Sequence, residues 1–172
     1  MNADLIKDAI RDVKDFPKEG ILFKDITPVL QDGKLLSLIV DLMDANYKEK
    51  PTKIIGVESR GFIFGTALAY KLGIGMVTVR KKGKLPCKTY EASYALEYGE
   101  ATLEIHQDAL EKGDRVVIVD DLLATGGTAE ATLKLVKKFD VEILGIEFLI
   151  ELEALKGRKV LAGENVNTII TY

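Results

Sequence analysis

Residues 120–128, which read Asp-Asp-Leu-Leu-Ala-Thr-Gly-Gly-Thr, combine acidic side chains with a loop suited to binding phosphate. Gly126 and Gly127 let the main chain approach a ligand closely, and Thr125 and Thr128 supply hydroxyl donors. A helix that begins near Thr128 adds free N–H groups and the positive end of its dipole. The segment therefore predicts a phosphate-binding cradle.

Asp120 and Asp121 precede this cradle and need a partner that tolerates two negative charges. Sugar hydroxyls donate to carboxylates, and magnesium binds carboxylate oxygens, so the residues alone leave both partners open. A helix preceded by an acidic turn is the plain structural alternative. The lysine of a Walker A loop is missing, and so is a G-x-G-x-x-G motif. A phosphorylated ribose, which presents phosphate and hydroxyls together, fits the pattern.

Two other segments supply positive charge. Arg60 follows a short apolar run and could clamp an anion with two parallel hydrogen bonds, or could make only a surface salt bridge. A second group places four charges within five positions: Arg80, Lys81, Lys82 and Lys84. Such runs are usually solvated loops and sometimes bind nucleic acid. However, no aromatic residue occurs among these positions before Tyr90, and the chain carries a net charge of −3, which disfavours a nucleic-acid partner.

The elements that must position these residues alternate between strands and helices. Short runs rich in β-branched residues predict strands buried on both faces at 54–57, 76–79 and 116–119. Two further strands are predicted at 141–152 and 166–171. Helices are predicted between and after them, at 61–72, where Gly73 supplies a C-cap, and at 128–138. This alternation predicts an α/β fold with a mainly parallel twisted sheet flanked by helices. Ligands then bind beyond the carboxyl ends of the strands, at loops 58–61, 80–90 and 120–128.

The remaining segments are predicted as two helices and a hairpin. Apolar spacing indicates helices at about 3–13 and 34–47, separated by the break at residues 16–20. Residues 91–106 are predicted to form an antiparallel hairpin that stands off the main sheet, with its turn at Tyr98 and Gly99.

Composition narrows the class of protein. The chain has 172 residues, of which 47% are hydrophobic and 30% charged, and this predicts one globular domain spanning residues 1–172. No apolar stretch is long enough for a membrane span, and no signal peptide is expected. The lone Cys87 fits a reducing compartment, so a cytoplasmic location is expected. The lone His106 leaves little material for a histidine triad or metal site and is predicted to be a surface residue at a strand end.

Several segments together resemble the type I phosphoribosyltransferases. Residues 117–128 are similar to the motif that binds phosphoribosyl pyrophosphate (PRPP) in this family, and more narrowly to its adenine-specific members. Residues 16–30 resemble the base-binding segment, 58–62 the pyrophosphate loop, 80–86 the mobile basic loop and 92–99 the start of the hairpin over the site. The matches keep their order from about Phe16 to Arg158. The resemblance divides the chain into an N-terminal base-binding or hood segment, about 1–33, and a mobile loop with hairpin, about 80–106.

The resemblance implies transfer of the phosphoribosyl group from PRPP to N9 of adenine, giving AMP and pyrophosphate in purine salvage. It places the 5′-phosphate on residues Ala124, Thr125, Gly126, Gly127 and Thr128, and the ribose on Asp120 and Asp121. Pyrophosphate would contact Ser59, Arg60, Arg80, Lys81 and Lys84. Adenine would lie against Phe23, with main-chain atoms of Leu22 and Lys24 reading its edge, although Phe23 could simply be core. Glu97, otherwise only a solubilising residue, would manage a proton near adenine N7, so the catalytic set would be Glu97, Asp120, Asp121 and Arg60.

The resemblance further implies that Mg²⁺ enters mainly through PRPP, without dedicated protein ligands, and that the enzyme is a homodimer in which Arg80 reaches the neighbouring subunit. Cys87 departs from the family pattern, which commonly has glycine there, and could alter closure of the mobile loop. Two competing functions remain: a transferase for hypoxanthine or xanthine, and a PRPP-sensing regulator without catalysis. A regulator needs a DNA- or RNA-reading element, and an N-terminal helix of about ten residues is too small for a winged-helix module.

Overall fold

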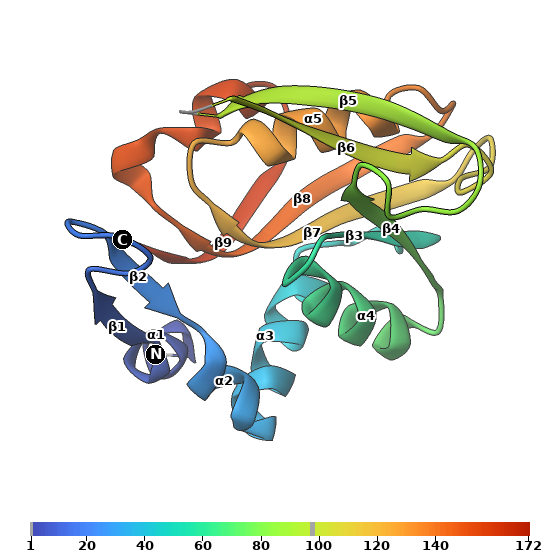
Figure 1. Cartoon of the computed structure of the whole chain (residues 1–172). Helices are drawn as coiled ribbons and strands as arrows, with labels where there is room; N and C mark the ends of the chain where they lie inside the picture. Colours follow the sequence, from blue (N-terminus) through green and yellow to red (C-terminus); the bar gives the residue numbers. More distant parts are fainter. Residues whose placement is uncertain (1, 97–98) are drawn as a thin grey trace.

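The computed structural model describes residues 2–96 and 99–172, and a seven-stranded sheet forms its centre (Figure 1). The strand order is β5-β6-β4-β3-β7-β8-β9. The strands span Lys53–Val57 (β3), Gly75–Lys81 (β4), Thr89–Leu96 (β5), Gly99–His106 (β6), Arg115–Leu123 (β7), Glu142–Glu151 (β8) and Val166–Thr171 (β9). Four neighbouring pairs are parallel: β4-β3, β3-β7, β7-β8 and β8-β9. The pairs β5-β6 and β6-β4 are antiparallel. The predicted α/β fold with a mainly parallel sheet is confirmed.

Both faces of this sheet are covered by helices, which explains why its strands are rich in β-branched residues. Ile55 and Ile118 pack in the core on the side of α5 (Gly127–Val136). Their neighbours Ile54 and Val117 pack in the core on the side of α3 (Gly33–Ala45) and α4 (Gly61–Leu72). Alternate residues of one strand therefore supply two cores, as expected for strands buried on both faces.

The helices agree closely with the sequence predictions at 34–47, 61–72 and 128–138. Asp32 caps α3 by accepting hydrogen bonds from the N–H groups of Lys34 and Leu35. The last turn of α4 ends at Gly73, whose φ of 67° is the left-handed conformation expected of a glycine C-cap. Two 3₁₀ helices, η1 (Glu153–Leu155) and η2 (Gly157–Leu161), lie between β8 and β9. Among the described residues no helix is long and apolar enough to cross a membrane.

The predicted hairpin is confirmed, but it is joined to the main sheet rather than standing off it. Arg80 and Lys81 of β4 pair with Glu104 and Leu103 of β6. The prediction was wrong on this point because β4 has a free edge after β3 has paired with its other side, and β6 fills that edge. Tyr98, assigned to the turn, lies outside the described residues.

The N-terminal segment also differs from its prediction. Helix α1 spans Asn2–Ala9 and ends before Val13, because β1 (Arg11–Lys14) pairs antiparallel with β2 (Leu22–Asp25). Cross-strand ion pairs hold this register, with Arg11 2.6 Å from Asp25 and Lys24 2.6 Å from Asp12. The prediction extended the helix to Val13 because apolar spacing within one segment does not show pairing with a strand that comes later in the chain. We call β1, β2 and the short helix α2 (Thr27–Gln31) the hood; it lies apart from the seven-stranded sheet (Figure 1).

Candidate active site

The predicted site loops meet at one edge of the sheet, where the parallel strands β4, β3 and β7 end side by side. A polar cavity of about 370 Å³ opens there, lined by Glu58, Ser59, Arg60, Lys81, Asp120, Asp121, Leu122, Ala124 and Thr128. The sequence predicted a strand that ends at residue 119 and placed the two aspartates in the following loop. This was wrong, because β7 continues to Leu123 and the aspartates belong to the end of the strand. Residues predicted for ribose, phosphate and pyrophosphate thus share one cavity.

The acid pair in this cavity is held close to Arg60. Arg60 Nε lies 2.8 Å from Asp121 Oδ2, and the Asp121 N–H donates to Asp120 Oδ1 at 2.8 Å. Burial, together with the neighbouring Asp121 carboxylate, raises the pKa of Asp120 well above its usual value. Burial also raises the pKa of Asp121, although Arg60 acts against this shift. The pair is costly to keep charged, which is typical of groups positioned for a ligand.

The predicted phosphate cradle forms a smaller cavity of about 130 Å³ beside the first. It is lined by residues 122–129, which include all five predicted phosphate ligands, and by Tyr94 and Ala95 of β5. A Cβ added to Gly127 would lie 2.9 Å from Tyr94 Cδ2, so the tyrosine ring closes directly over the cradle. Its hydroxyl lies 3.3 Å from Thr128 Oγ1. Tyr94 was missed from sequence because only the folding of the hairpin onto α5 brings it here.

The basic loop has only one of its four cations in the polar cavity, Lys81. Arg80 instead pairs with Glu58 at 3.2 Å, and Lys82 pairs with Glu91 at 2.7 Å. Although partial burial acts to raise it, hydrogen bonds from Lys81 N–H and Arg80 hold the pKa of Glu58 below its usual value. Arg80 is thus engaged within its own chain in this conformation.

The root of the basic loop is tied to the hairpin by a buried carboxylate. Glu104 of β6 accepts hydrogen bonds from the N–H groups of Lys84 at 2.9 Å and Leu85 at 2.7 Å. Cys87, further along, is exposed. The described non-glycine residues with positive φ are Asp15 and Lys156, so Cys87 replaces the family's glycine in an ordinary backbone conformation.

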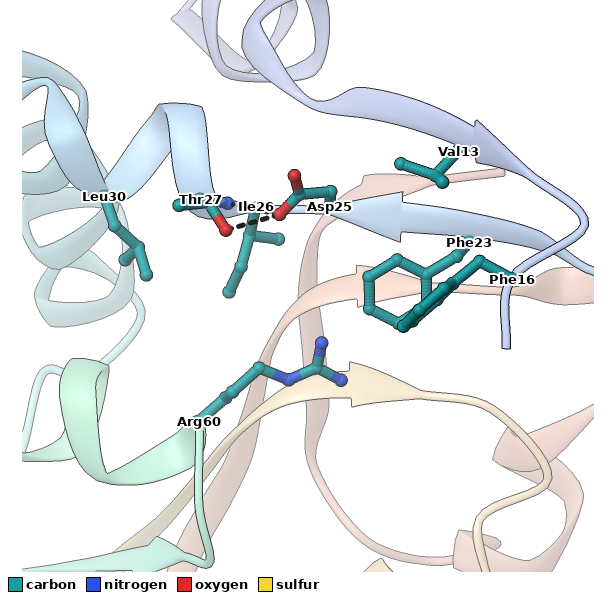
Figure 2. A pocket seen from close by; sticks show the side chains of 8 residues that line it. All are labelled: Val13, Phe16, Phe23, Asp25, Ile26, Thr27, Leu30 and Arg60. Carbon is teal, nitrogen blue, oxygen red and sulfur yellow. Dashed lines mark hydrogen bonds between the residues drawn. The ribbon is translucent and has the colours of Figure 1, made fainter.

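A second large cavity, of about 420 Å³, lies under the hood (Figure 2). The rings of Phe16 and Phe23 form one wall, packed edge to face with centroids 5.1 Å apart, and Ile26 and Leu30 lie across from them. Val13, Asp25 and Thr27 complete the lining together with Arg60. An apolar slot between aromatic and aliphatic side chains suits a flat, ring-shaped ligand.

Phe23 therefore lines a cavity, as the base-binding hypothesis requires, instead of being simple core. The side chains of its neighbours point elsewhere: Leu22 is half exposed, and Lys24 Nζ lies 3.8 Å above the Tyr172 ring. Phe16 was quoted in the sequence motif without a role, and Val13 was assigned to a helix. Both were missed as lining residues because the β1–β2 pairing that aligns them was not predicted.

Arg60 belongs to both cavities and joins them. Its guanidinium carbon lies 5.5 Å from the centroid of the Phe23 ring, while its Nε pairs with Asp121. Figure 2 shows the guanidinium reaching from the start of α4 toward the aromatic wall. The surface salt bridge considered from sequence is an ion pair inside the site, and it connects the apolar slot to the acid pair.

Two other predicted residues need separate mention. Glu97 lies outside the described residues. His106 is half-buried, not a surface residue, and its Nε2 is buried without a hydrogen-bond partner among the described residues. His106 does end β6, and the following turn is closed by Ala109 N–H, which donates to His106 O at 3.2 Å.

Comparison with known proteins agrees with this geometry. The "Phosphoribosyl transferase domain" family profile matches residues 31–164. Adenine phosphoribosyltransferase of Francisella philomiragia is 56% identical over 175 residues, covering 100% of both chains.

Solved structures give the same result. Adenine phosphoribosyltransferase from Thermoanaerobacter pseudethanolicus superposes with a TM-score of 0.94 at 50% identity, covering 99% of each chain. The enzyme from Saccharomyces cerevisiae, complexed with an imino-altritol bisphosphate and adenine, superposes with a TM-score of 0.92 at 41% identity, covering 98% of each chain. A phosphoribosyltransferase profile across most of the chain and close relatives over its whole length leave one assignment: the chain belongs to the adenine phosphoribosyltransferase family.

Proposed function

We propose that this chain is an adenine phosphoribosyltransferase that makes AMP and pyrophosphate from adenine and PRPP. The observation that carries the proposal is the junction at Arg60, where an apolar aromatic slot meets a polar cavity with a phosphate cradle. A flat base and a phosphorylated sugar bound in these two cavities would meet beside Arg60. Relatives named adenine phosphoribosyltransferase, identical at more than half of their positions, support the same substrates.

The proposed reaction forms the bond from adenine N9 to ribose C1′ and breaks the bond from C1′ to pyrophosphate. The N9 proton leaves the base, and both electrons of the broken bond leave with pyrophosphate. Catalysis then rests on positioning the two substrates and on stabilising charge, and needs no covalent nucleophile. Asp120 and Asp121 would hold ribose hydroxyls and favour positive charge on the ring. Arg60 and Lys81 would favour the negative charge that builds on pyrophosphate, with Ser59, Arg80 and Lys84 as further contacts.

The proposed 5′-phosphate site is the cradle from Ala124 to Thr128. Main-chain N–H groups at the start of α5 and the hydroxyls of Thr125 and Thr128 supply donors for phosphate oxygens. Their position next to the acid pair supports a ligand that presents a phosphate and hydroxyls together. The bound yeast relative, whose ligand is a bisphosphate, is consistent with this use of the cradle.

Adenine, in preference to hypoxanthine or xanthine, is supported by the hood. The family profile begins at residue 31, so the hood lies almost wholly outside the region shared by phosphoribosyltransferases in general. Relatives that include this segment carry the adenine name, and the yeast relative was solved with adenine bound. Main-chain atoms of Leu22 and Lys24 are proposed to read the edge of the base that stacks on Phe23.

Magnesium is proposed to enter with PRPP. Among the described residues no group of three or more histidine, cysteine, aspartate or glutamate side chains converges as a metal cage. Asp120 and Asp121 nevertheless place carboxylate oxygens beside the polar cavity, which fits an ion that keeps water and substrate oxygens as most of its ligands. Bound there, Mg²⁺ would neutralise charge on pyrophosphate.

A homodimer and a cytoplasmic location are also proposed. Ile63 and Tyr70, seven residues apart on α4, are 40% and 89% exposed, which supports a partner surface on that helix. To contact the neighbouring subunit as proposed, Arg80 would have to leave its ion pair with Glu58. An active monomer in sedimentation analysis would refute the homodimer and the contact proposed for Arg80. The exposed, unpaired Cys87 supports a reducing compartment.

The decisive assay measures pyrophosphate release with PRPP, Mg²⁺ and each purine base in turn. We expect AMP formation with adenine and little product with hypoxanthine or xanthine. Activity with hypoxanthine alone would overturn the choice of base, and inactivity with every base would favour the regulator. Glu97→Gln tests the proposed proton role, because it should lower turnover more than the affinity for PRPP.

A further inference from the structure

The phosphate cradle rests on the 3₁₀ segment between β8 and β9, and the two segments approach most closely at Gly126 and Gly157. Gly126 has a φ of 88°, and a Cβ added there would lie 2.7 Å from Gly157 O and 2.4 Å from Val160 Cγ2. A Cβ added to Gly157 would lie 2.3 Å from Ala124 O. Residues 124–126 therefore take their position from a surface that Gly157 provides.

Arg158, the next residue, anchors this segment to the sheet. Its Nε lies 2.8 Å from both carboxylate oxygens of Glu151, at the end of β8. Its Nη1 donates to Val166 O at 2.8 Å and its Nη2 to Thr168 Oγ1 at 3.1 Å, both on β9. One guanidinium thus uses its planar set of donors to fix η2 to two strands.

The acceptor of this anchor is itself held in place. The Glu151 side chain is only 6% exposed and also accepts a hydrogen bond from Thr168 Oγ1 at 3.2 Å. Next to it, Leu152 N–H donates to Leu123 O at 2.9 Å, which joins the end of β8 to the residue that leads into the cradle. The anchor and the cradle consequently share one rigid frame.

We propose that Arg158 is a positioning residue for the 5′-phosphate. It contacts no lining residue of the cradle directly, but by holding Gly157 against residues 124–126 it aims their N–H groups at the phosphate. The proposal rests on the proposed function, because it concerns the affinity of the same cradle. It predicts an effect confined to phosphate-bearing ligands, since the side-chain hydrogen bonds of Arg158 go to β8 and β9 and to no residue that lines the hood cavity.

Three graded variants test the proposal. Arg158→Met removes the whole anchor, Arg158→Lys keeps a charge near Glu151 without the fork, and Thr168→Val removes one hydroxyl. We expect the KM for PRPP to rise about tenfold or more in Arg158→Met, less in Arg158→Lys and least in Thr168→Val, as expected when a binding group is slightly misplaced. The KM for adenine and kcat should stay within about twofold of wild type. The two milder variants carry the test if Arg158→Met leaves buried Glu151 too poorly paired to fold.

Arg115→Met is the matched control, because Arg115 hydrogen-bonds Lys50 O at 3.1 Å from the opposite end of β7. It should leave both KM values unchanged. The proposal fails if folded Arg158→Lys and Thr168→Val keep the wild-type KM for PRPP, or if both KM values rise together. Binding of ribose 5-phosphate, measured by calorimetry, gives the same comparison without turnover. Absence of AMP formation by wild type would instead refute the proposed function.

Discussion

The cradle and the hood represent two ways of building a binding site. The cradle follows β7, whose residues Val116–Val119 are fully buried, and its main chain is supported from behind by η2. The hood is a two-stranded ribbon outside the main sheet, and its walls are side chains such as Phe16, which is 50% exposed. A phosphate needs fixed N–H donors, which a rigid core supplies. A base needs a slot between rings, which a lightly packed ribbon can form.

The acidic side chains of the two regions also differ in how their charge affects stability. Burial raises the pKa values of Asp120 and Asp121 beside the cradle, so that their charges cost stability. In the hood, hydrogen bonds from Thr27 and Arg11 lower the pKa of Asp25 to about 2, so that its charge adds stability. One acid pair is positioned for a ligand, whereas the other acid holds the hood together.

The largest effect is expected from Asp120→Asn. Losing one of the ribose acids should reduce kcat/KM by about 10²–10³-fold, the range seen when a preorganised electrostatic group is removed. Because the folded-state pKa of Asp120 is raised, the free energy of unfolding falls as pH rises above the unfolded value. The asparagine variant should therefore be as stable as wild type at pH 7, or more stable.

Steady-state kinetics and thermal unfolding of Asp120→Asn check the two parts together. A folded variant with near-normal turnover would show that Asp120 takes no part in the reaction. A large fall in Tm would show that the charge of Asp120 stabilises the fold, and would contradict the expectation that this charge costs stability.

The next largest effect is expected in the hood, from Phe23→Ala. Stacking of a base on an aromatic ring is worth about 1–3 kcal/mol, so the KM for adenine should rise about 5–150-fold. The KM for PRPP should change little, because Phe23 does not line the polar cavity. Leu22→Ala, which truncates an exposed neighbour on the same strand, is the control. Equal rises in the KM for adenine and the KM for PRPP would contradict separate binding sites.

A smaller effect is expected from Tyr94→Phe. The ring that covers Gly127 stays, and only the hydroxyl 3.3 Å from Thr128 Oγ1 is lost. One hydrogen bond is worth about 0.5–1.5 kcal/mol, which predicts a rise of about 2–10-fold in the KM for PRPP. Tyr90→Phe, on the same strand and with its ring packed against Phe139, is the control and should leave the KM for PRPP unchanged. An unchanged KM for PRPP in Tyr94→Phe would mean that the ring alone matters.

The smallest effect, measured as a change in stability, is expected from Asp25→Asn. The pKa of Asp25 is about 2 when folded and near 3.8 when unfolded, so its contribution is complete above about pH 4 and is lost as pH falls toward 2. The variant should lower Tm at pH 7 by about 2–4 °C, and less at pH 2, where wild type has lost the same contribution. Unfolding scans from pH 2 to 7 test this. An equal Tm difference at both ends would contradict the assignment.

The sequence predicted the cradle half of the molecule well, because its signals are local. Residues 116–119 and 128–138 were located by composition and periodicity, and the glycines and threonines between them follow directly along the chain. The parallel order of β4, β3 and β7 then brings the three predicted loops to one edge. The end of β7 was misplaced, because its pairing with β8 continues past the two aspartates to Leu123, which strand propensity does not show.

The hood half was predicted less well, because its structure depends on contacts between segments. Val13 fits the apolar period of the preceding helix, and only pairing with Phe23 across β1 and β2 reveals a strand. Tyr94 covers the cradle from another part of the chain, and Arg158 is proposed to position it from a third, so that no short motif links either residue to it. Arg60 was predicted to clamp an anion, but its second position beside Phe23 could be found only from the fold.

If the cradle binds PRPP and the hood binds adenine, a variant in one of them should leave the other substrate unaffected, and two variants test this separation. Gly127→Val fills the cradle against Tyr94, Phe23→Ala opens the slot, and Gly75→Val, at a glycine with open space around it, is the control. Kinetics with both substrates varied should show a raised KM for PRPP alone in the first variant and for adenine alone in the second. If folded Gly127→Val and Phe23→Ala impair both substrates equally, the account is wrong.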